Sequence, residues 1–266
     1  MPLSYSANHD NRLTSAQNPK IKHLKKLISS TSFRKETGQI VLEHEPTLDA
    51  LLAQERPNDL IHSLYVREDA KHESLQPNYP TYLVSPTLWA HISPLKNSPG
   101  RLALLNRPNA PSLESIIGSS QKIVILDRIQ DPQNLGAIIR NAVAFHAQGI
   151  LLLPGCADPY HPLTLRASAG LALSIPILEH TIPTVLPRLS GWTCIGLDPH
   201  AKTPLSQLTK AEKYALFLGS EGQGLSSDIP ITRYKIPSHP AAESLNVSVA
   251  SGIALYHLFN LAHSKV

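Results

Sequence analysis

The segment "KIVILDRIQDPQNLGAIIRNAVAFHA", residues 122–147, contains the pattern that decides the fold. Its apolar run "KIVILD" is long enough for one buried strand, and the apolar spacing in "NLGAIIRNAVAFHA" predicts a helix directly after it. Four more strand-like runs follow, "GILLLP" (149–154), "IPILE" (175–179), "WTCIGLD" (192–198) and "YALFLG" (214–219). Helical patterns lie in "PLTLRASAGLAL" (162–173) and from Leu245 onward. Nearly continuous apolar strands separated by helices indicate an α/β fold with a parallel sheet covered on both faces.

Three polar segments follow predicted strands of this half: "DRIQDPQN" (127–134), "GSEGQGLS" (219–226) and, after "RYKI", "PSHPAAESLN" (237–246). Ligands of parallel sheets bind beyond the carboxyl ends of the strands, so we expect the three segments to form one site. The glycine-rich segment matches neither a P-loop nor a dinucleotide-binding pattern. Taken alone, it is equally typical of a tight turn with positive φ at Gly222 or Gly224, where Glu221 could bind exposed backbone N–H groups.

The other polar residues also have simpler interpretations when each is taken alone. Either Asn134 or the pair Asp131–Pro132 begins the first helix. Arg140 lies about 120° around that helix from Asn134, so the two meet at one pocket only if the long Arg140 side chain reaches back. Otherwise Arg140 is a surface ion-pair residue. Ser244 and Asn246 could be no more than N-cap residues of the last helix.

The 266-residue chain is 42% hydrophobic and 17% charged, which is typical of a globular protein of one or two domains. No apolar run approaches the roughly 20 residues of a membrane span. The first 20 residues lack the apolar core of a signal peptide, so we expect a cytoplasmic protein. Cys156 and Cys194 lie in apolar contexts and are interpreted as inert thiols. The 13 histidines have no ligand spacing, and no metal site is predicted.

Basic residues cluster in residues 1–36, which contain seven Lys or Arg and only Asp10 and Glu36 as acids. "NPKIKHLKKLISS" predicts a helix with Asn18 as N-cap, an apolar stripe and lysines on the opposite face. Such a face is either merely solvated or binds a phosphate backbone. The candidates for RNA contact are Lys20, Lys22, Lys25, Lys26, Arg34 and Lys35.

Strand-like and helical patterns also alternate before residue 107, so residues 1–106 are predicted to form a smaller α/β domain. Its strand-like runs are "QIVLE", "SLYVRE", "TYLVS" and "RLALLN", and its helical patterns include "PTLDALLAQ" and "SPTLWAHI". Residues 107–121 are rich in Pro, Asn, Ser and Gly and are predicted to be a linker. The second domain then spans residues 122–266.

In order and spacing, "DRIQDPQNLGAIIRNAVAFHAQGILL", "LFLGSEGQGLS" and "IPSHPAAESLNVSVASGIALYHL" closely resemble the three signature motifs of the SpoU (TrmH-like) family of RNA ribose 2′-O-methyltransferases. "HPLTLRASAGLALSIPI" looks like the family's intervening segment. "NPKIKHLKKL" and "GQIVLEHEPTLDALL" are similar to its N-terminal substrate-binding domain, which is ribosomal-protein-like in fold. The chain departs from the family at His44, where glycine commonly follows the glutamate.

The resemblance implies a catalytic domain threaded into a trefoil knot, with S-adenosylmethionine bound in the knot. It implies that the cofactor contacts Leu218, Gly219, Glu221, Gly222, Ile236, Leu245 and Asn246. It assigns the central catalytic role to Arg140, and Asn134, Glu221, Ser244 and Asn246 would support it. The guanidinium stays protonated, so we expect Arg140 to bind a phosphate and stabilise negative charge on the 2′-oxygen.

The family is typically dimeric through the last helix. Ser248, Ser251 and Gly252 are then small either for that interface or for a tight helix crossing within one chain. Ribosomal RNA is favoured over transfer RNA as substrate, by analogy. The alternative of a non-catalytic RNA-binding protein predicts erosion of the motif residues, which are all present. An oxidoreductase is disfavoured because no glycine fingerprint follows "KIVILD".

Overall fold

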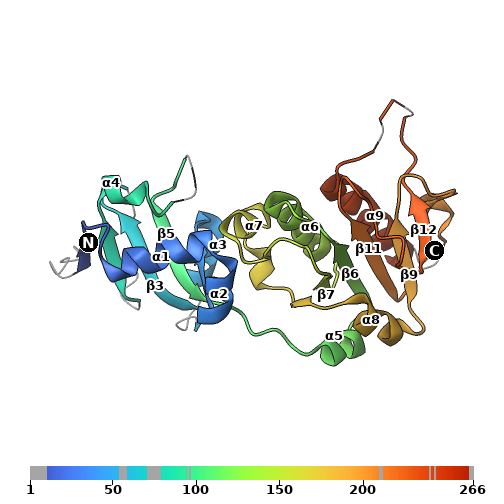
Figure 1. Ribbon diagram of the computed structural model, residues 1–266, viewed down its shortest axis with the longest axis horizontal. Coiled ribbons are helices and arrows are strands. Elements are labelled where there is room, and N and C mark those ends of the chain that lie inside the picture. The colour runs from blue at the N-terminus through green and yellow to red at the C-terminus, as the bar shows by residue number, and fades with distance from the viewer. Residues whose placement is uncertain are drawn as a thin grey trace. The chain divides into compact units, whose positions relative to one another are not determined.

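The computed structural model describes residues 11–53, 59–70, 79–93, 95, 97–209, 212–239, 241–242 and 244–263. The chain divides into two compact units (Figure 1): Met1–Pro108 together with Tyr160–Gly170, and Asn109–Pro159 together with Leu171–Val266. Residues 1–10, which belong to the segment without a signal core, lie outside the described residues, as do Pro240 and Glu243 of the third polar segment. In the described ranges, no helix is both long and apolar enough to cross a membrane.

A seven-stranded sheet forms the centre of the second unit, in the order β10-β12-β9-β11-β6-β7-β8. Every pairing in it is parallel, which confirms the predicted parallel sheet. The central strands β6 and β11 run in register and place Asp127 beside Gly219 at the carboxyl edge. The strands are β6 (Lys122–Asp127), β7 (Gly149–Leu152), β8 (Ile177–Glu179), β9 (Thr193–Leu197), β10 (Thr203–Pro204), β11 (Tyr214–Gly219) and β12 (Thr232–Lys235).

Helices cover both faces of this sheet (Figure 1). On one face, α5 (Leu113–Ser119), α8 (Ile182–Val185) and the 3-10 turn η3 (Leu186–Leu189) enclose a core with Ile123, Ile125 and Phe217 of the central strands. On the other face lie α6 (Pro132–Ala144) and the long C-terminal helix α9 (Val247–His263), which pack against each other. A short 3-10 turn, η4 (Leu205–Gln207), follows β10.

Helix α5 corrects the prediction that residues 107–121 are only a linker. Ser112 caps this helix by accepting a hydrogen bond from the N–H of Ser115, and Leu113 and Ile116 are buried in the core of the second unit. The apolar pair Leu113 and Ile116, three residues apart, anchors the segment despite its polar composition. The boundary between the units lies inside the predicted linker, between Pro108 and Asn109, and the second unit begins before residue 122.

The predicted helix over 162–173 is also interrupted. Helix α7 (Pro162–Ala167) ends, Ala169 and Gly170 have φ of 51° and 76°, and the 3-10 turn η2 (Leu171–Leu173) follows. A Cβ at Gly170 would overlap the Thr47 side chain, whose hydroxyl donates to the Ala169 carbonyl at 2.8 Å. Tyr160–Gly170 accordingly belongs with the first unit.

The first unit contains a five-stranded mixed sheet in the order β1-β4-β3-β5-β2, in which β5 is antiparallel to both β2 and β3. Each strand and helix predicted in this half is present, although α4 is shorter than its pattern. The strands are β1 (Arg12–Leu13), β2 (Gln39–Leu42), β3 (Ile61–Arg67), β4 (Thr81–Val84) and β5 (Arg101–Asn106), and the helices are α1 (Pro19–Ser29), α2 (Thr31–Thr37), α3 (Glu45–Leu52) and α4 (Pro86–Trp89). The likeness of this unit to a ribosomal protein stays a prediction.

Helix α1 begins as predicted, because Asn18 accepts a hydrogen bond from the Lys20 N–H and Pro19 occupies the first position. Arg34, however, is 1% exposed, so the prediction that it contacts RNA is wrong. Its guanidinium turns back and donates to the carbonyls of Leu27 and Ile28 at the end of α1 and to the Thr31 hydroxyl. These carbonyls have no partner within the helix, and a buried cation satisfies them.

Candidate active site at the carboxyl edge of the parallel sheet

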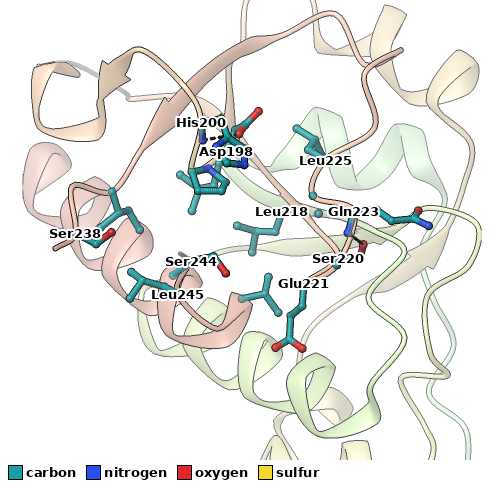
Figure 2. Close-up of a pocket in the computed structure, with 18 of the residues that line it drawn as sticks. Asp198, His200, Leu218, Ser220, Glu221, Gln223, Leu225, Ser238, Ser244 and Leu245 are labelled. Carbon is teal, nitrogen blue, oxygen red and sulfur yellow. Dashed lines mark hydrogen bonds between the residues drawn. The ribbon is translucent and has the colours of Figure 1, made fainter. Parts of the chain in front are cut away.

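A pocket of about 610 Å³ opens at the carboxyl edge of the parallel sheet, beside the ends of β9, β11 and β12. Figure 2 shows Leu218, Ser244 and Leu245 around this hollow, with Asp198 and His200 on the opposite wall. Seven of the predicted site residues line it: Leu218, Gly219, Glu221, Gly222, Ile236, Ser244 and Leu245. The second and third polar segments therefore converge, as the sheet topology predicts.

Gly219 allows the chain to form the floor of this pocket. A Cβ at this position would overlap the backbone of Gly224 and Leu225, so only glycine permits the close approach. Ser220 and Gly224 then pair as an antiparallel bridge, and Gly224 turns with φ of 65°. Of the two glycines proposed for the positive-φ turn, Gly224 is the one that adopts it, and Gly222 does not.

The first polar segment joins the other two through a network of three side chains. Asn134 donates from Nδ2 to Glu221 Oε1 at 2.8 Å. Asn246 donates from Nδ2 to the same carboxylate oxygen and, at 3.1 Å, to Asn134 Oδ1. Glu221 is thus bound by two amide side chains and does not serve to satisfy the backbone of its own turn. One residue from each segment contributes to the network.

The N-termini of α6 and α9 are capped by different residues, and only the cap of α9 belongs to the network. Asp131 caps α6 by accepting from the Gln133 N–H at 3.0 Å, so Asn134 is not the cap and its amide can point at Glu221. Asn246 has both functions at α9: its Oδ1 accepts from the Ser248 N–H at 2.9 Å while its Nδ2 faces the network. The same residue therefore links helix capping to the site.

Comparison of the chain with known proteins shows the family to which it belongs. Residues 121–256 match the model of the SpoU rRNA Methylase family, and this is about half of the chain. The chain belongs to the SpoU rRNA methylase family. A protein named as an uncharacterized tRNA/rRNA methyltransferase from Synechocystis sp. is 33% identical over 257 residues, which cover 92% of both chains. The family is one of RNA methyltransferases, as the motifs indicate.

Two further similar proteins carry more specific names. The 23S rRNA (guanosine-2′-O)-methyltransferase RlmP of Bacillus subtilis is 27% identical and covers 93% of this chain and 98% of its own. The crystal structure of an AdoMet-bound rRNA methyltransferase from Sinorhizobium meliloti superposes with a TM-score of 0.78 at 24% identity, over 96% of this chain and 98% of that one. The second likeness shows the shared α/β fold with its parallel sheet.

Arg140 is the one predicted catalytic residue of this SpoU chain that lies away from both the pocket and its side-chain network. It is exposed on α6, and it is absent from the residues that line the described pocket. Its six-residue separation from Asn134 places it on another face of the helix. An RNA or a second protein chain must approach this face if Arg140 acts on a ligand in a pocket.

Four charged residues that hold the pocket were not singled out from the sequence. Asp127 is the last residue of β6 and Arg128 follows it, Asp198 follows β9, and Arg233 lies on β12. Both carboxylates stand at the end of a parallel strand, and that shared position was the available signal. Partial burial alone would raise the pKa of Asp198, but the His200 N–H and the Arg233 guanidinium outweigh it and lower that pKa below its usual value.

The small residues of α9 pack within the chain in this SpoU protein. Asn141 of α6 donates to the Ser248 carbonyl and to the Ser251 hydroxyl, both at 2.9 Å. A Cβ at Gly252 would lie 3.2 Å from the Asn141 amide nitrogen. Of the two interpretations of these small residues, the tight crossing within one chain accounts for Ser251 and Gly252.

Neither cysteine has the environment of a reactive thiol. Burial raises the pKa of Cys156 to about 11, and its Sγ donates to the Leu126 carbonyl. Burial also raises the pKa of Cys194. Among the residues that the structure describes, no group of three or more His, Cys, Asp or Glu could hold a metal ion.

Proposed function

We propose that this SpoU-family chain transfers the methyl group of S-adenosylmethionine to a ribose 2′-hydroxyl of structured RNA, with ribosomal RNA as the favoured substrate. The network of Asn134, Glu221 and Asn246 beside the pocket carries the proposal, because it joins three distant segments at the edge where ligands of parallel sheets bind. The name of the Bacillus relative supports ribose methylation of ribosomal RNA, and the AdoMet-bound Sinorhizobium structure supports the cofactor.

The pocket fits such a cofactor. Its volume of about 610 Å³ lies within the roughly 300–1,000 Å³ of small-molecule sites. Leu218, Ile236 and Leu245 offer apolar contacts, and Gly219 and Gly222 expose backbone groups. These residues would hold S-adenosylmethionine, together with Glu221 and Asn246. The cofactor supplies a methyl group on a positively charged sulfonium when it is bound.

The network of Asn134, Glu221 and Asn246 orients the acceptor ribose and takes no part in bond making. Asn246 is fixed by the α9 backbone and in turn fixes Asn134 and Glu221, so neither loses much freedom when a ligand binds. One oxygen of Glu221 accepts hydrogen bonds from both amides, and its second oxygen can accept a hydrogen bond from a hydroxyl of the acceptor ribose. Ser244 lies on the pocket wall, where its hydroxyl can contact the same ligand. The network therefore holds the acceptor ribose against the pocket.

Arg140 would supply the positive charge. Its guanidinium stays protonated, so it binds a phosphate of the RNA and stabilises negative charge that grows on the 2′-oxygen. Because Arg140 does not line the pocket of its own chain, a dimer can bring it to a partner's site. Mixing chains with Arg140→Ala and chains with Asn246→Ala would restore activity only if the two residues act from different protomers.

A homodimer through α9 fits the surface of that helix. Val249, Ile253 and Tyr256 are 51%, 42% and 57% exposed and share one face. A second copy would cover them. The trefoil knot is part of the same proposal, and the close backbone approach at Gly219 supports it.

The first unit would bind the RNA. Lys20, Lys22, Lys26 and Lys35 are exposed on α1 and α2, and Lys25 is half-buried. Exposed lysines neutralise phosphates without reading the base sequence. The proposal includes action on this RNA in the cytoplasm.

The direct test is methyl transfer in vitro to ribosomal RNA and to transfer RNA, followed by mapping of 2′-O-methyl groups. We expect methylation of ribosomal RNA by the wild-type chain and none by Arg140→Ala, which should keep its fold and its affinity for S-adenosylmethionine in calorimetry. Undiminished turnover by Arg140→Ala would remove that residue from the mechanism. Binding of RNA without methylation of any RNA would favour the non-catalytic alternative.

A further inference from the structure

One wall of the pocket is the loop Gly219–Ser226, which carries Glu221 and accepts hydrogen bonds from two arginine side chains. We call it the pocket loop. Its own hydrogen bonds are few: the Gly224 N–H donates to the Ser220 carbonyl at 2.9 Å, and the Gln223 N–H to the Ser220 hydroxyl at 3.3 Å. Three successive carbonyls, those of Gly224, Leu225 and Ser226, are instead bound by guanidinium groups.

Arg128 holds one side. Its Nη1 donates to Gln223 Oε1 at 2.5 Å and its Nη2 to the Gly224 carbonyl at 3.3 Å. The same guanidinium binds both oxygens of Asp127, at 3.1 and 3.0 Å, and Asp127 Oδ2 accepts from the Ser226 N–H at 2.8 Å. Asp127 is 4% exposed, so its carboxylate is a buried anchor.

Arg128 reaches the pocket loop from an uncommon backbone conformation. Its φ is 56°, in the left-handed region that favours glycine. Gly155 leaves space for it, since a Cβ there would lie 3.1 Å from Arg128 Cγ. Arg128 therefore keeps an unfavourable backbone conformation while its side chain binds Gln223, 95 residues away.

Arg233 holds the other side. Its Nη1 donates to the Leu225 carbonyl at 3.2 Å and to Asp198 Oδ2 at 3.0 Å, and its Nη2 donates to the Ser226 carbonyl at 2.7 Å. Arg233 and Asp198 both line the pocket. Figure 2 shows Gln223 and Leu225 on the loop and Asp198 across the pocket from Glu221. Arg128 binds the loop at Gln223 and Gly224, whereas Arg233 binds it at Leu225 and Ser226.

We infer that Arg128 and Arg233 are positioning residues that pre-organise the pocket loop for the cofactor. This inference rests on the proposed function for the identity of the ligand. A flexible loop must be ordered when the ligand binds, and holding it in place beforehand removes that cost. The arginines act through Glu221 and the loop backbone, so their loss weakens cofactor binding more than it slows transfer by the loaded enzyme.

The test uses Arg128→Gly and Arg128→Ala in the full chain. Glycine removes the side chain and tolerates the positive φ, whereas alanine removes the side chain and keeps the strained backbone. Both should raise the Kd for S-adenosylmethionine by about tenfold or more and raise KM for it more than they lower kcat. Amide hydrogen exchange of residues 219–226 should become faster than in the wild type, while exchange in β6 and β11 stays unchanged.

Arg233→Lys tests the second arginine, and Arg188→Gln is the control. Lysine can pair with Asp198 but cannot span two successive carbonyls, so Arg233→Lys should recover only part of the affinity that Arg233→Ala loses. Arg188 is an exposed arginine whose partners are Glu114 and Thr184, and none of the three lines the pocket, so Arg188→Gln should change neither affinity nor exchange.

Unchanged exchange at 219–226 in Arg128→Gly would overturn the inference, whatever the cofactor affinity. A uniform increase in exchange across β6, β11 and the loop would also overturn it, because the arginine would then support global stability only. If the wild-type chain binds no S-adenosylmethionine, the proposed function fails, and the exchange measurement on the free protein still decides whether the arginines order the loop.

Discussion

The pocket edge of the second unit and the α1–α2 surface of the first unit both contain polar residues, but they differ in how those residues are held. At the pocket edge, Glu221 binds Asn134, 87 residues away, and Asn246. On α1 and α2, most of the lysines are exposed, and the ammonium groups of Lys20 and Lys26 lie over the rings of Tyr82 and Phe33. Loss of one member of a network leaves partner groups unsatisfied, whereas loss of an exposed lysine changes mainly the charge. The two regions should therefore respond very differently to substitution.

The largest effect is expected at Gly219. In Gly219→Ala the new Cβ would overlap the Gly224–Leu225 backbone, which cannot move as a side chain can, so we expect a loss of about 3 kcal/mol or more in unfolding free energy and no cofactor binding. Gly222→Ala is the matched control, because no atom lies within 4 Å of its added Cβ and its φ is not positive. Chemical denaturation measures the stability of both variants and calorimetry their cofactor binding, and an equal loss of stability in the two variants would contradict the packing argument.

Arg34 and Lys35 are neighbours in the basic cluster, but Arg34 is buried and structural whereas Lys35 is exposed and is proposed to bind RNA. Arg34→Met leaves the Leu27 and Ile28 carbonyls without their donor and should cost about 2–3 kcal/mol of stability. Lys35→Gln should change stability by less than about 0.5 kcal/mol but weaken RNA binding and reduce its salt dependence by about one ion. Urea unfolding and RNA titrations at several salt concentrations separate the two. The same loss of stability in both variants would refute the conclusion that Arg34 is structural and Lys35 is not.

Asn246 connects stability and activity, and two substitutions can separate them. Asn246→Ala removes the cap of α9 and should cost about 1 kcal/mol, while Asn246→Ser keeps a capping oxygen and should cost only a few tenths. Serine is too short to reach Glu221 and Asn134, so both variants should lose most methyl transfer. Unfolding and turnover are measured on the same preparations. Full activity in Asn246→Ser would show that the network is dispensable.

The second unit could be predicted from the sequence because its physical signals are local. The runs "KIVILD" and "YALFLG" are apolar enough to be buried on both faces, and they are the two central strands. The position of the pocket followed from topology, since polar segments after parallel strands share one edge. The family motifs then indicated which residues on those segments to examine.

What could not be predicted depends on long-range packing. Arg34 looks like its lysine neighbours in sequence, and only the return of α2 onto the end of α1 buries it. Leu113 and Ile116 lie in a Pro- and Ser-rich segment that is typical of a linker until the core of the second unit accepts them. The break at Ala169–Gly170 follows from a contact with Thr47, more than a hundred residues earlier. Arg128 and Arg233 could have been suspected only by pairing them with the carboxylates that end β6 and β9.

The smallest effect is expected from Glu43, a buried charge in the first unit that resembles the pocket edge more than the lysine surface. It is 5% exposed and accepts hydrogen bonds from the Ser93 and Ser98 hydroxyls. Burial raises its pKa above the usual 4.5, although the two serines and the positive charges of Arg166 and Arg67 partly oppose this.

Because the folded state then holds the Glu43 proton more tightly than the unfolded state, the stability that this proton contributes is complete below the usual pKa and is lost as pH rises through the folded pKa. Glu43→Gln keeps an acceptor for the serines and cannot ionise, so its stability should not show this decline. Urea unfolding of both proteins at successive pH values from about 4 to 8 measures the difference. A wild-type chain that gains stability relative to Glu43→Gln as pH rises through this window would mean that hydrogen bonds and nearby arginines, rather than burial, dominate the carboxyl group.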